Sequence, residues 1–225
     1  MKKILIVAAH PDDEILGCAG TAARLISKGL EAHTLILGQG LASRVSTKDN
    51  YGINQELSKL KHQACLANKK IGVKTVSFCD FPDNQLDTLP LLEIIRAVEK
   101  VKNRIKPAMV FTHFFADLNI DHRLTYQAVI TATRPALDES VKEIYSFEVL
   151  SSTEWNFPLS FSPNVFFDIS DFLEHKIEAM QEYKMELRKS GHPRSIEGIK
   201  LNARAWGIKS GTKYAEAFQA VRVMK

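Results

Sequence analysis

The most constraining feature of this chain is an apolar run near the N-terminus that ends abruptly in a polar cluster. Residues 4–9 are short, apolar and rich in β-branched side chains, whereas residues 10–14 read His-Pro-Asp-Asp-Glu. A run of this length and composition is typical of a central strand in a parallel sheet buried on both faces. The polar cluster then lies at the carboxyl end of the strand, the edge where open α/β sheets bind their ligands.

The rest of the chain repeats this alternation of strands and helices. Apolar periodicity predicts helices over residues 17–28, 54–68, 89–105, 121–134, 171–189 and 195–207. Further strands are expected over residues 32–37, 73–78, 108–112, 144–150, 164–168 and 217–223. Strand–helix units in series need right-handed crossovers, which predicts an α/β fold with a Rossmann-like, mostly parallel sheet and helices on both faces. Because the 225 residues contain no linker or internal repeat, we expect a single domain over residues 1–225.

Charge, hydropathy and cysteine content limit which partners the protein can bind and where in the cell it is expected. A net charge of +4 is too mild to indicate nucleic-acid binding, although it is compatible with an anionic sugar or a nucleotide-linked substrate. The first apolar run stops at His10 without a small-residue cleavage site, and no stretch is long enough to span a bilayer, so we expect a cytoplasmic protein. Cys18, Cys65 and Cys79 are too widely spaced for a disulfide framework or a zinc finger, and we expect reduced core residues. A homo-oligomer is compatible with the sequence.

A second polar cluster predicts a metal site together with the first. Residues 112–122 follow an expected strand and lead into the helix at 121–134, which places His122 near its first turn. His10, Asp13 and His122 then form a set of two histidines and one carboxylate, which can hold a divalent metal and leave positions open for water and substrate. Zinc is the first expectation, while the same ligands also suit iron(II) and oxygen chemistry.

The adjacent acids Asp12 and Asp13 suggest a division of roles. Side chains of neighbouring residues at a helix start diverge by about 100°, so Asp13 can bind the metal while Asp12 faces the water that the metal activates and serves as general base. The alternative is simple helix capping, which explains the acids but not His10. Asp121 has two interpretations as well: it orients a neighbouring imidazole, or it caps the helix that follows.

These motifs resemble the PIG-L/LmbE family of zinc-dependent N-acetyl sugar deacetylases. The resemblance is carried by Ala9-His10-Pro11-Asp12-Asp13-Glu14, Gly17, Gly20-Thr21, Asp121-His122, His192-Pro193-Arg194-Ser195 and Tyr214-Ala215-Glu216-Ala217-Phe218. It implies a Rossmann-like fold, zinc held by His10, Asp13 and His122, and Asp12 as general base. It also implies a small-molecule amino-sugar substrate, usually based on N-acetylglucosamine, that loses its acetyl group as acetate.

The chain departs from the family pattern at Asn119. Members with a His-x-Asp-His pattern carry a histidine there, which stabilises the oxyanion or protonates the leaving amine. Asparagine can donate a hydrogen bond but cannot act as an acid, so Asn119 is expected to do the first job only. The proton must come from Asp12 after it has acted as base, or from His192 or His113 if their loops fold over the site.

Candidate substrate-binding residues lie in two loops. Arg44 matches a position that contacts substrate in similar enzymes, although a solvated surface arginine is the alternative. His192 and Arg194 are candidates in the tail, and turns also favour residues such as Arg194 and Asp83 for local reasons.

Four aromatic residues and one alternative function remain to be considered. Phe114, Phe115, Trp155 and Phe157 can stack on a sugar ring or anchor loops and core. The rival to a hydrolase is a metal-free sugar- or nucleotide-binding protein. Dinucleotide binding is disfavoured because the first turn lacks Gly-x-Gly-x-x-Gly and puts acids where a phosphate would lie.

Overall fold

The computed structural model describes residues 2–41 and 50–224. The strands are β1 (Lys3–Ala8), β2 (Glu31–Gly38), β3 (Thr75–Phe81), β4 (Met109–His113), β5 (Glu143–Phe147), β6 (Val165–Asp168) and β7 (Ala215–Val223). The α-helices are α1 (Asp13–Ser27), α2 (Asn50–Lys70), α3 (Leu91–Ile105), α4 (Ile120–Ala132), α5 (Leu173–Glu182) and α6 (Ile196–Ser210), and two short 3-10 turns are η1 (Leu86–Thr88) and η2 (Thr153–Trp155).

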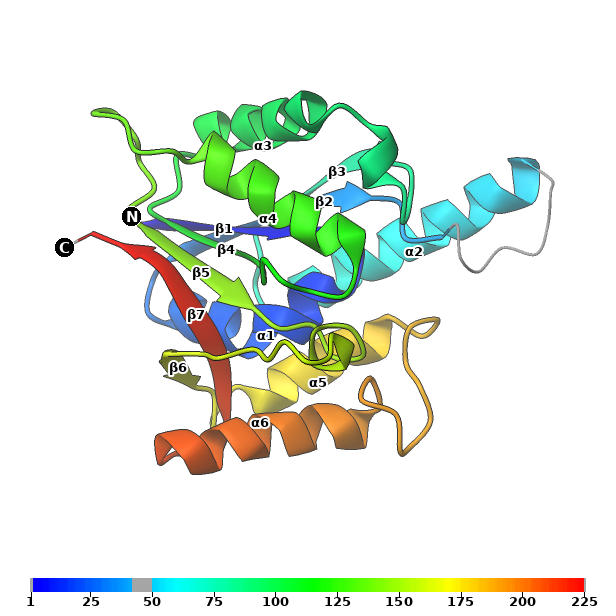
Figure 1. Cartoon of the computed structure of the whole chain (residues 1–225). Helices are drawn as coiled ribbons and strands as arrows, with labels where there is room; N and C mark the ends of the chain where they lie inside the picture. The colour runs from blue at the N-terminus through cyan, green and yellow to red at the C-terminus, as the bar shows by residue number, and fades with distance from the viewer. Residues whose placement is uncertain (1, 42–49, 225) are drawn as a thin grey trace.

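Within the described residues the strands form one sheet in the order β3-β2-β1-β4-β5-β7-β6 (Figure 1). β1 to β5 pair with one another in parallel, and β7 runs antiparallel to both β5 and β6. The order 3-2-1-4-5 reverses direction between β1 and β4, which makes the carboxyl ends of these two strands the topological switch point. The predicted Rossmann-like, mostly parallel sheet is therefore confirmed.

Helices cover both faces of the sheet because the side chains of each strand alternate between them. On β1, Ile4, Ile6 and Ala8 pack into the core formed with α1, α2, α5 and α6. Leu5 and Val7 pack into the second core, which α3 and α4 contribute. Figure 1 shows α3 and α4 on one side of the sheet and α1, α5 and α6 on the other. The period of two in this strand is what buries both of its faces.

Helix α1 begins earlier than its periodicity predicts and changes direction at Cys18. Asp13 and Glu14 belong to its first turn, and Cys18 has the non-helical dihedrals φ −150° and ψ 18°. After this kink the backbone N–H groups of Gly20 and Thr21 donate to the carboxylate of Glu216 at 3.0 and 2.7 Å. The carboxylate therefore satisfies N–H groups that the kink removes from the helical ladder.

Close packing explains the glycine at position 17. A Cβ atom added to Gly17 would overlap the ring of Phe147, which is fully buried in β5. Helix α1 can therefore lie this close to the sheet only without a side chain at this position.

Three local expectations were wrong. The predicted helix over residues 171–189 ends at Glu182, because the chain leaves helical geometry at Tyr183, whose hydroxyl donates to Glu14. The strand expected over 144–150 ends at Phe147. Cys65 is exposed rather than part of the core, whereas Cys18 is buried. In the described part of the chain, no helix has both the length and the apolar character that a membrane crossing requires.

Candidate metal centre and active site

His10, Asp13 and His122 converge at the switch point of the sheet. His10 follows β1, Asp13 is the first residue of α1, and His122 lies in the first turn of α4, which follows β4. One ligand atom from each residue lies within 4.8 Å of the others, and all three residues are buried. The sequence predicted this set, and the pairing of β1 with β4 is what brings its members together.

The Asp13 carboxylate is the centre of this cluster. Its Oδ2 accepts the backbone N–H of His10 at 2.8 Å and lies 3.4 Å from His10 Nδ1 and 3.3 Å from His122 Nε2. Burial alone would raise the pKa of Asp13, but the charge of His122 and the hydrogen bonds from His10 and His122 lower that pKa well below its ordinary value. Asp13 is therefore held as a carboxylate between two imidazoles.

Two buried acids fix the other edge of the His10 ring. His10 Nε2 lies 2.9 Å from Asp121 Oδ2 and 3.2 Å from Asp83 Oδ1. Asp121 Oδ1 also accepts the backbone N–H of Leu86 at 3.0 Å. The ring therefore presents Nδ1 to Asp13, and Asp121 orients a neighbouring imidazole. The cap of α4 is Asn119, whose Oδ1 accepts the N–H of Asp121 at 2.8 Å, so capping is not the role of Asp121.

Asp117 holds His122 in the same way, a role that was not predicted from the sequence. Its Oδ1 lies 3.0 Å from His122 Nδ1, and it also accepts the N–H of Asn119 and the hydroxyls of Ser152 and Thr153. Burial would raise the pKa of Asp117, but the interaction with His122 lowers it to about 2. A carboxylate behind a metal-ligating histidine fixes its orientation and tautomer. The signal for this role was an acid in the same strand-end loop as His122.

The donor set and the charge around the two histidines fit a divalent cation. Burial would lower the pKa of His10, but hydrogen bonds to Asp121 and Asp13 raise it to about 10. Burial would likewise lower the pKa of His122, but Asp13 and Asp117 raise it to about 9. The carboxylates around the two imidazoles therefore favour positive charge at this cluster. Two imidazole nitrogens and one carboxylate oxygen are the donors of an open zinc site.

Asp12 lines the same cavity as the metal cluster and pairs with the segment between α5 and α6. Asp12 Oδ2 accepts a hydrogen bond from Arg194 Nη1 at 3.0 Å, and its backbone N–H donates to Glu14 Oε2 at 3.1 Å. Asp12 occupies the N-cap position of α1, yet its side chain makes no capping hydrogen bond. The divergence of Asp12 and Asp13 that the sequence predicted is therefore present, and helix capping does not account for Asp12.

Glu14, the last residue of the cluster, is buried beneath the site. Its Oε1 accepts hydrogen bonds from the Tyr183 hydroxyl at 2.6 Å and from Asn68 Nδ2 at 2.8 Å. Burial raises the pKa of Glu14 to about 8. Tyr183 and Asn68 lie on distant segments, so no local pattern in the sequence indicated them.

The other candidates for proton transfer occupy different environments. His113 is fully buried, its Nε2 accepts the N–H of Ala9 at 2.8 Å, and its ring stacks on His122. Burial and the neighbouring His122 lower the pKa of His113 well below its ordinary value, so it is a neutral acceptor rather than an acid. His192 contacts the ring of Trp155, and its Nδ1 accepts the N–H of Arg194 at 3.0 Å.

A cavity of about 100 Å³ opens beside the cluster. It is lined by His10, Pro11, Asp12, Asp13, Gly40, Asp83, Asn84, Asn119, His122, Ser151, Ser152 and Arg194. Asn119 and Arg194 thus reach the cavity, whereas His192 lies outside this lining. Arg44 lies outside the described residues. Among the aromatic candidates, Phe114 is buried, while Phe115, Trp155 and Phe157 expose large parts of their side chains.

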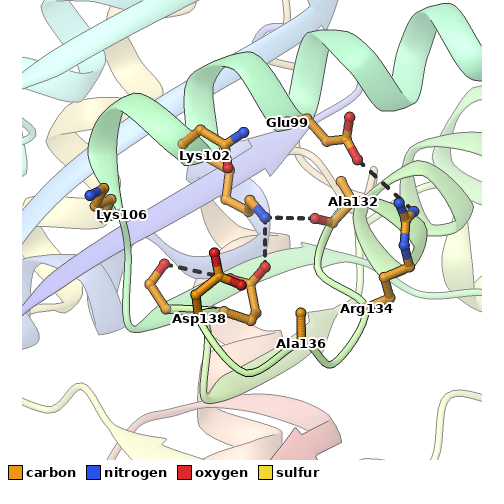
Figure 2. Close-up of a pocket in the computed structure, with 10 residues that line it drawn as sticks. Glu99, Lys102, Lys106, Ala132, Arg134, Ala136 and Asp138 are labelled. Carbon is orange, nitrogen blue, oxygen red and sulfur yellow. Dashed lines mark hydrogen bonds and ion pairs between the residues drawn. The ribbon is translucent and has the colours of Figure 1, made fainter.

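A larger cavity of about 440 Å³ lies elsewhere, at the C-terminal ends of α3 and α4 (Figure 2). Its buried ammonium group, Lys102 Nζ, donates to Ala132 O at 2.9 Å and to Glu139 Oε2 at 2.6 Å. Because α3 leads into the start of β4, this cavity is at the opposite edge of the sheet from His10 and His122. Its lining holds no histidine, so size alone does not identify the functional site.

The chain is similar in sequence to known deacetylases. The chain is 31% identical over 189 residues to the uncharacterized deacetylase YaiS of Escherichia coli (strain K12), covering 81% of this chain and 91% of YaiS. It is 27% identical over 229 residues to the diacetylchitobiose deacetylase of Thermococcus kodakarensis, covering 98% of this chain and 84% of that protein.

The fold is also found in an enzyme of different chemistry. The structure of GalB, the 4-carboxy-2-hydroxymuconate hydratase of Pseudomonas putida KT2440, matches with a TM-score of 0.80 at 22% identity and covers 100% of this chain and 99% of that one. At this identity the likeness shows the fold alone.

The family model of PIG-L, described as GlcNAc-PI de-N-acetylase, matches residues 5–133, which contain both polar clusters. The chain therefore belongs to the PIG-L family.

Proposed function

We propose that this protein is a zinc-dependent hydrolase that removes the N-acetyl group from an N-acetylglucosamine-type sugar or sugar conjugate and releases acetate. The observation that carries the proposal is the convergence of His10, Asp13 and His122 beside Asp12 in one cavity. The family match and the deacetylase relatives supply the substrate class.

His10, Asp13 and His122 are the residues that would hold the metal. When bound there, a zinc ion supplies a Lewis acid for the amide carbonyl and lowers the pKa of water toward neutrality. Asp83, Asp117 and Asp121 orient the two imidazoles, so the ligands are placed before a metal arrives. Because the imidazoles are already oriented, less conformational entropy is lost when the metal binds.

Asp12 is the residue that moves the proton. Its carboxylate lines the cavity and accepts a proton from the attacking water as the new carbon–oxygen bond forms. The same carboxyl group then gives the proton to the amine nitrogen as the carbon–nitrogen bond breaks. His113 cannot take this second step because it is a buried neutral acceptor, and Asn119 has no acidic proton.

Asn119 is suited to hold the carbonyl oxygen of the substrate. Its Oδ1 caps α4, and its Nδ2 donates one hydrogen bond to Asn84 Oδ1 at 2.9 Å. An amide nitrogen carries two N–H groups, so a second donor remains for the developing oxyanion. Anchoring at both ends fixes the direction of this donor.

The test is acetate release from N-acetylglucosamine and N,N'-diacetylchitobiose by metal-stripped protein with and without stoichiometric zinc. We expect zinc-dependent release, which His122→Ala abolishes together with tight zinc binding. His62→Ala, a change at an exposed histidine of α2, is the matched control and should leave both unchanged. Release by stripped protein, or sugar binding without release in the presence of zinc, would contradict the proposal. Turnover restored by iron(II) and accompanied by oxygen consumption would indicate an oxygenase instead.

A further inference from the structure

The proposed base has a partner from a distant part of the sequence. Arg194 Nη1 donates to Asp12 Oδ2 across 182 residues of sequence. We infer that Arg194 is the positioning residue for Asp12, and that its main contribution is to turnover rather than to substrate binding. The inference rests on the proposed function, because it takes Asp12 as the group that moves the proton.

The backbone of Asp12 needs such an anchor. Asp12 has φ 100°, in the left-handed region that favours glycine. A non-glycine residue in this region is strained, and surrounding contacts must hold it there. The hydrogen bond from the backbone N–H of Asp12 to Glu14 holds its backbone, while the hydrogen bond from Arg194 holds its carboxylate.

The guanidinium group is itself held by other contacts. Its Nε donates to the carbonyl oxygen of Leu150 at 3.2 Å, and Nη1 lies 3.6 Å from Oε2 of the buried Glu186. The Arg194 side chain is only 15% exposed. A planar guanidinium presents its donors in fixed directions, so contacts on Nε and Nη1 determine where the Asp12 carboxylate lies.

Charge adds a second reason for the arrangement. Asp12 is 2% exposed, and the residue that follows it, Asp13, is a second buried carboxylate. A buried carboxylate among like charges is costly unless a cation pairs with it. Arg194 supplies that cation through its contact with Asp12 Oδ2.

The segment that carries Arg194 is separate from the region that the family model matches. Arg194 and Glu186 lie in the connection between α5 and α6, beyond residues 5–133. The same connection contributes Tyr183, whose hydroxyl donates to Glu14 Oε1 at 2.6 Å. This connection therefore reaches the first motif at both Asp12 and Glu14.

The experiment compares Arg194→Gln and Arg194→Lys with wild type, using zinc-loaded protein and N,N'-diacetylchitobiose. Because a misplacement of about 1 Å costs on the order of 100-fold in rate, kcat of Arg194→Gln should fall about 10- to 100-fold. KM and zinc affinity should stay within about threefold, since the metal ligands and the cavity floor remain. Guanidinium ion at sub-denaturing concentration should restore part of kcat in Arg194→Gln. The kcat of Arg194→Lys should be lower than that of Arg194→Gln rescued by guanidinium, because an ammonium group lacks the planar, fixed donor directions of a guanidinium group.

Arg188→Gln is the matched control, because Arg188 is an exposed arginine in the same connection. A raised KM with unchanged kcat in Arg194→Gln would overturn the inference and make Arg194 a substrate-binding residue. If wild type releases no acetate, the proposed function fails, and the crystal structure of Arg194→Gln decides the inference by itself. A carboxylate of Asp12 that moves in that structure supports positioning by Arg194, and one that stays in place overturns it.

Discussion

Asp117 Oδ1 lies 3.0 Å from Nδ1 of His122, while Nε2 of the same ring lies 3.3 Å from Asp13 Oδ2. The imidazole is thus held between one carboxylate behind it and another at the metal cluster. Asp117 also accepts the hydroxyls of Ser152 and Thr153, which tie the start of η2 to the site.

Asp117→Asn should weaken zinc binding by about 10- to 100-fold, because an amide lacks the charge that fixes the imidazole orientation. The measurement is a competitive titration of stripped protein with a chromogenic chelator. Asp138→Asn, a change at an exposed acid of the other cavity, serves as control and should bind zinc like wild type. Unchanged affinity in Asp117→Asn would show that His122 needs no such support.

Glu14 should make the stability of the metal-stripped protein depend on pH. Burial raises its pKa from 4.5 to about 8, so between these values the native state binds a proton that the unfolded state has lost. The contribution of Glu14 to the free energy of unfolding is therefore fully present below about pH 4.5 and declines as pH rises toward 8. Glu14→Gln removes this titration, so its stability should fall less over that range.

The measurement is urea denaturation of stripped wild type and Glu14→Gln at several pH values between about 5 and 9. Glu178→Gln, a change at an exposed acid of α5, is the control and should follow the wild-type curve. If the free energy of unfolding changed with pH equally in Glu14→Gln and wild type, the pH dependence would come from another group.

The features of the fold and the candidate site that depend on local sequence patterns could be predicted from the sequence. The parallel strands follow from short apolar runs, and His10, Asp13 and His122 were identifiable because each follows or begins an element at the same edge of the sheet. The pairing of Arg194 with Asp12 was not identifiable, because it depends on where α5 ends. The apolar period continues past Glu182, whereas the tertiary contact of Tyr183 with Glu14 accompanies the end of the helix. Asp117 was visible in its cluster, but its role depends on the rotamer of His122.

Gly17→Ala should destabilise the protein by about 1–3 kcal/mol, because the added Cβ overlaps the ring of Phe147 and the core must shift. Phe147→Leu, which removes part of that ring, should cost stability alone but less in the Gly17→Ala background. A double-mutant cycle of thermal unfolding gives this coupling energy. Additive effects would mean that the overlap is relieved by movement of α1 rather than by contact with Phe147.

Lys176 and Glu216 form a buried ion pair that supports the kink in α1. Lys176 Nζ donates to Glu216 Oε1 at 2.6 Å and to the carbonyl oxygen of Leu16 at 2.7 Å, on one side of the kink. Glu216 accepts the N–H groups of Gly20 and Thr21 on the other side. The pair therefore satisfies a carbonyl and two N–H groups that face each other across Cys18.

Lys176→Met should destabilise the protein by about 3–5 kcal/mol, because it leaves the Glu216 carboxylate buried without its cation. Adding Glu216→Gln should recover part of this loss, since glutamine carries no charge and its carbonyl oxygen still accepts one of the two N–H groups. Glu216→Gln alone should be destabilising, because it leaves the ammonium of Lys176 unpaired. Urea denaturation of the three variants and wild type measures the cycle. If Glu216→Gln deepens the loss caused by Lys176→Met, the carboxylate stabilises the kink by accepting two N–H groups at once, and its charge is not the dominant cost.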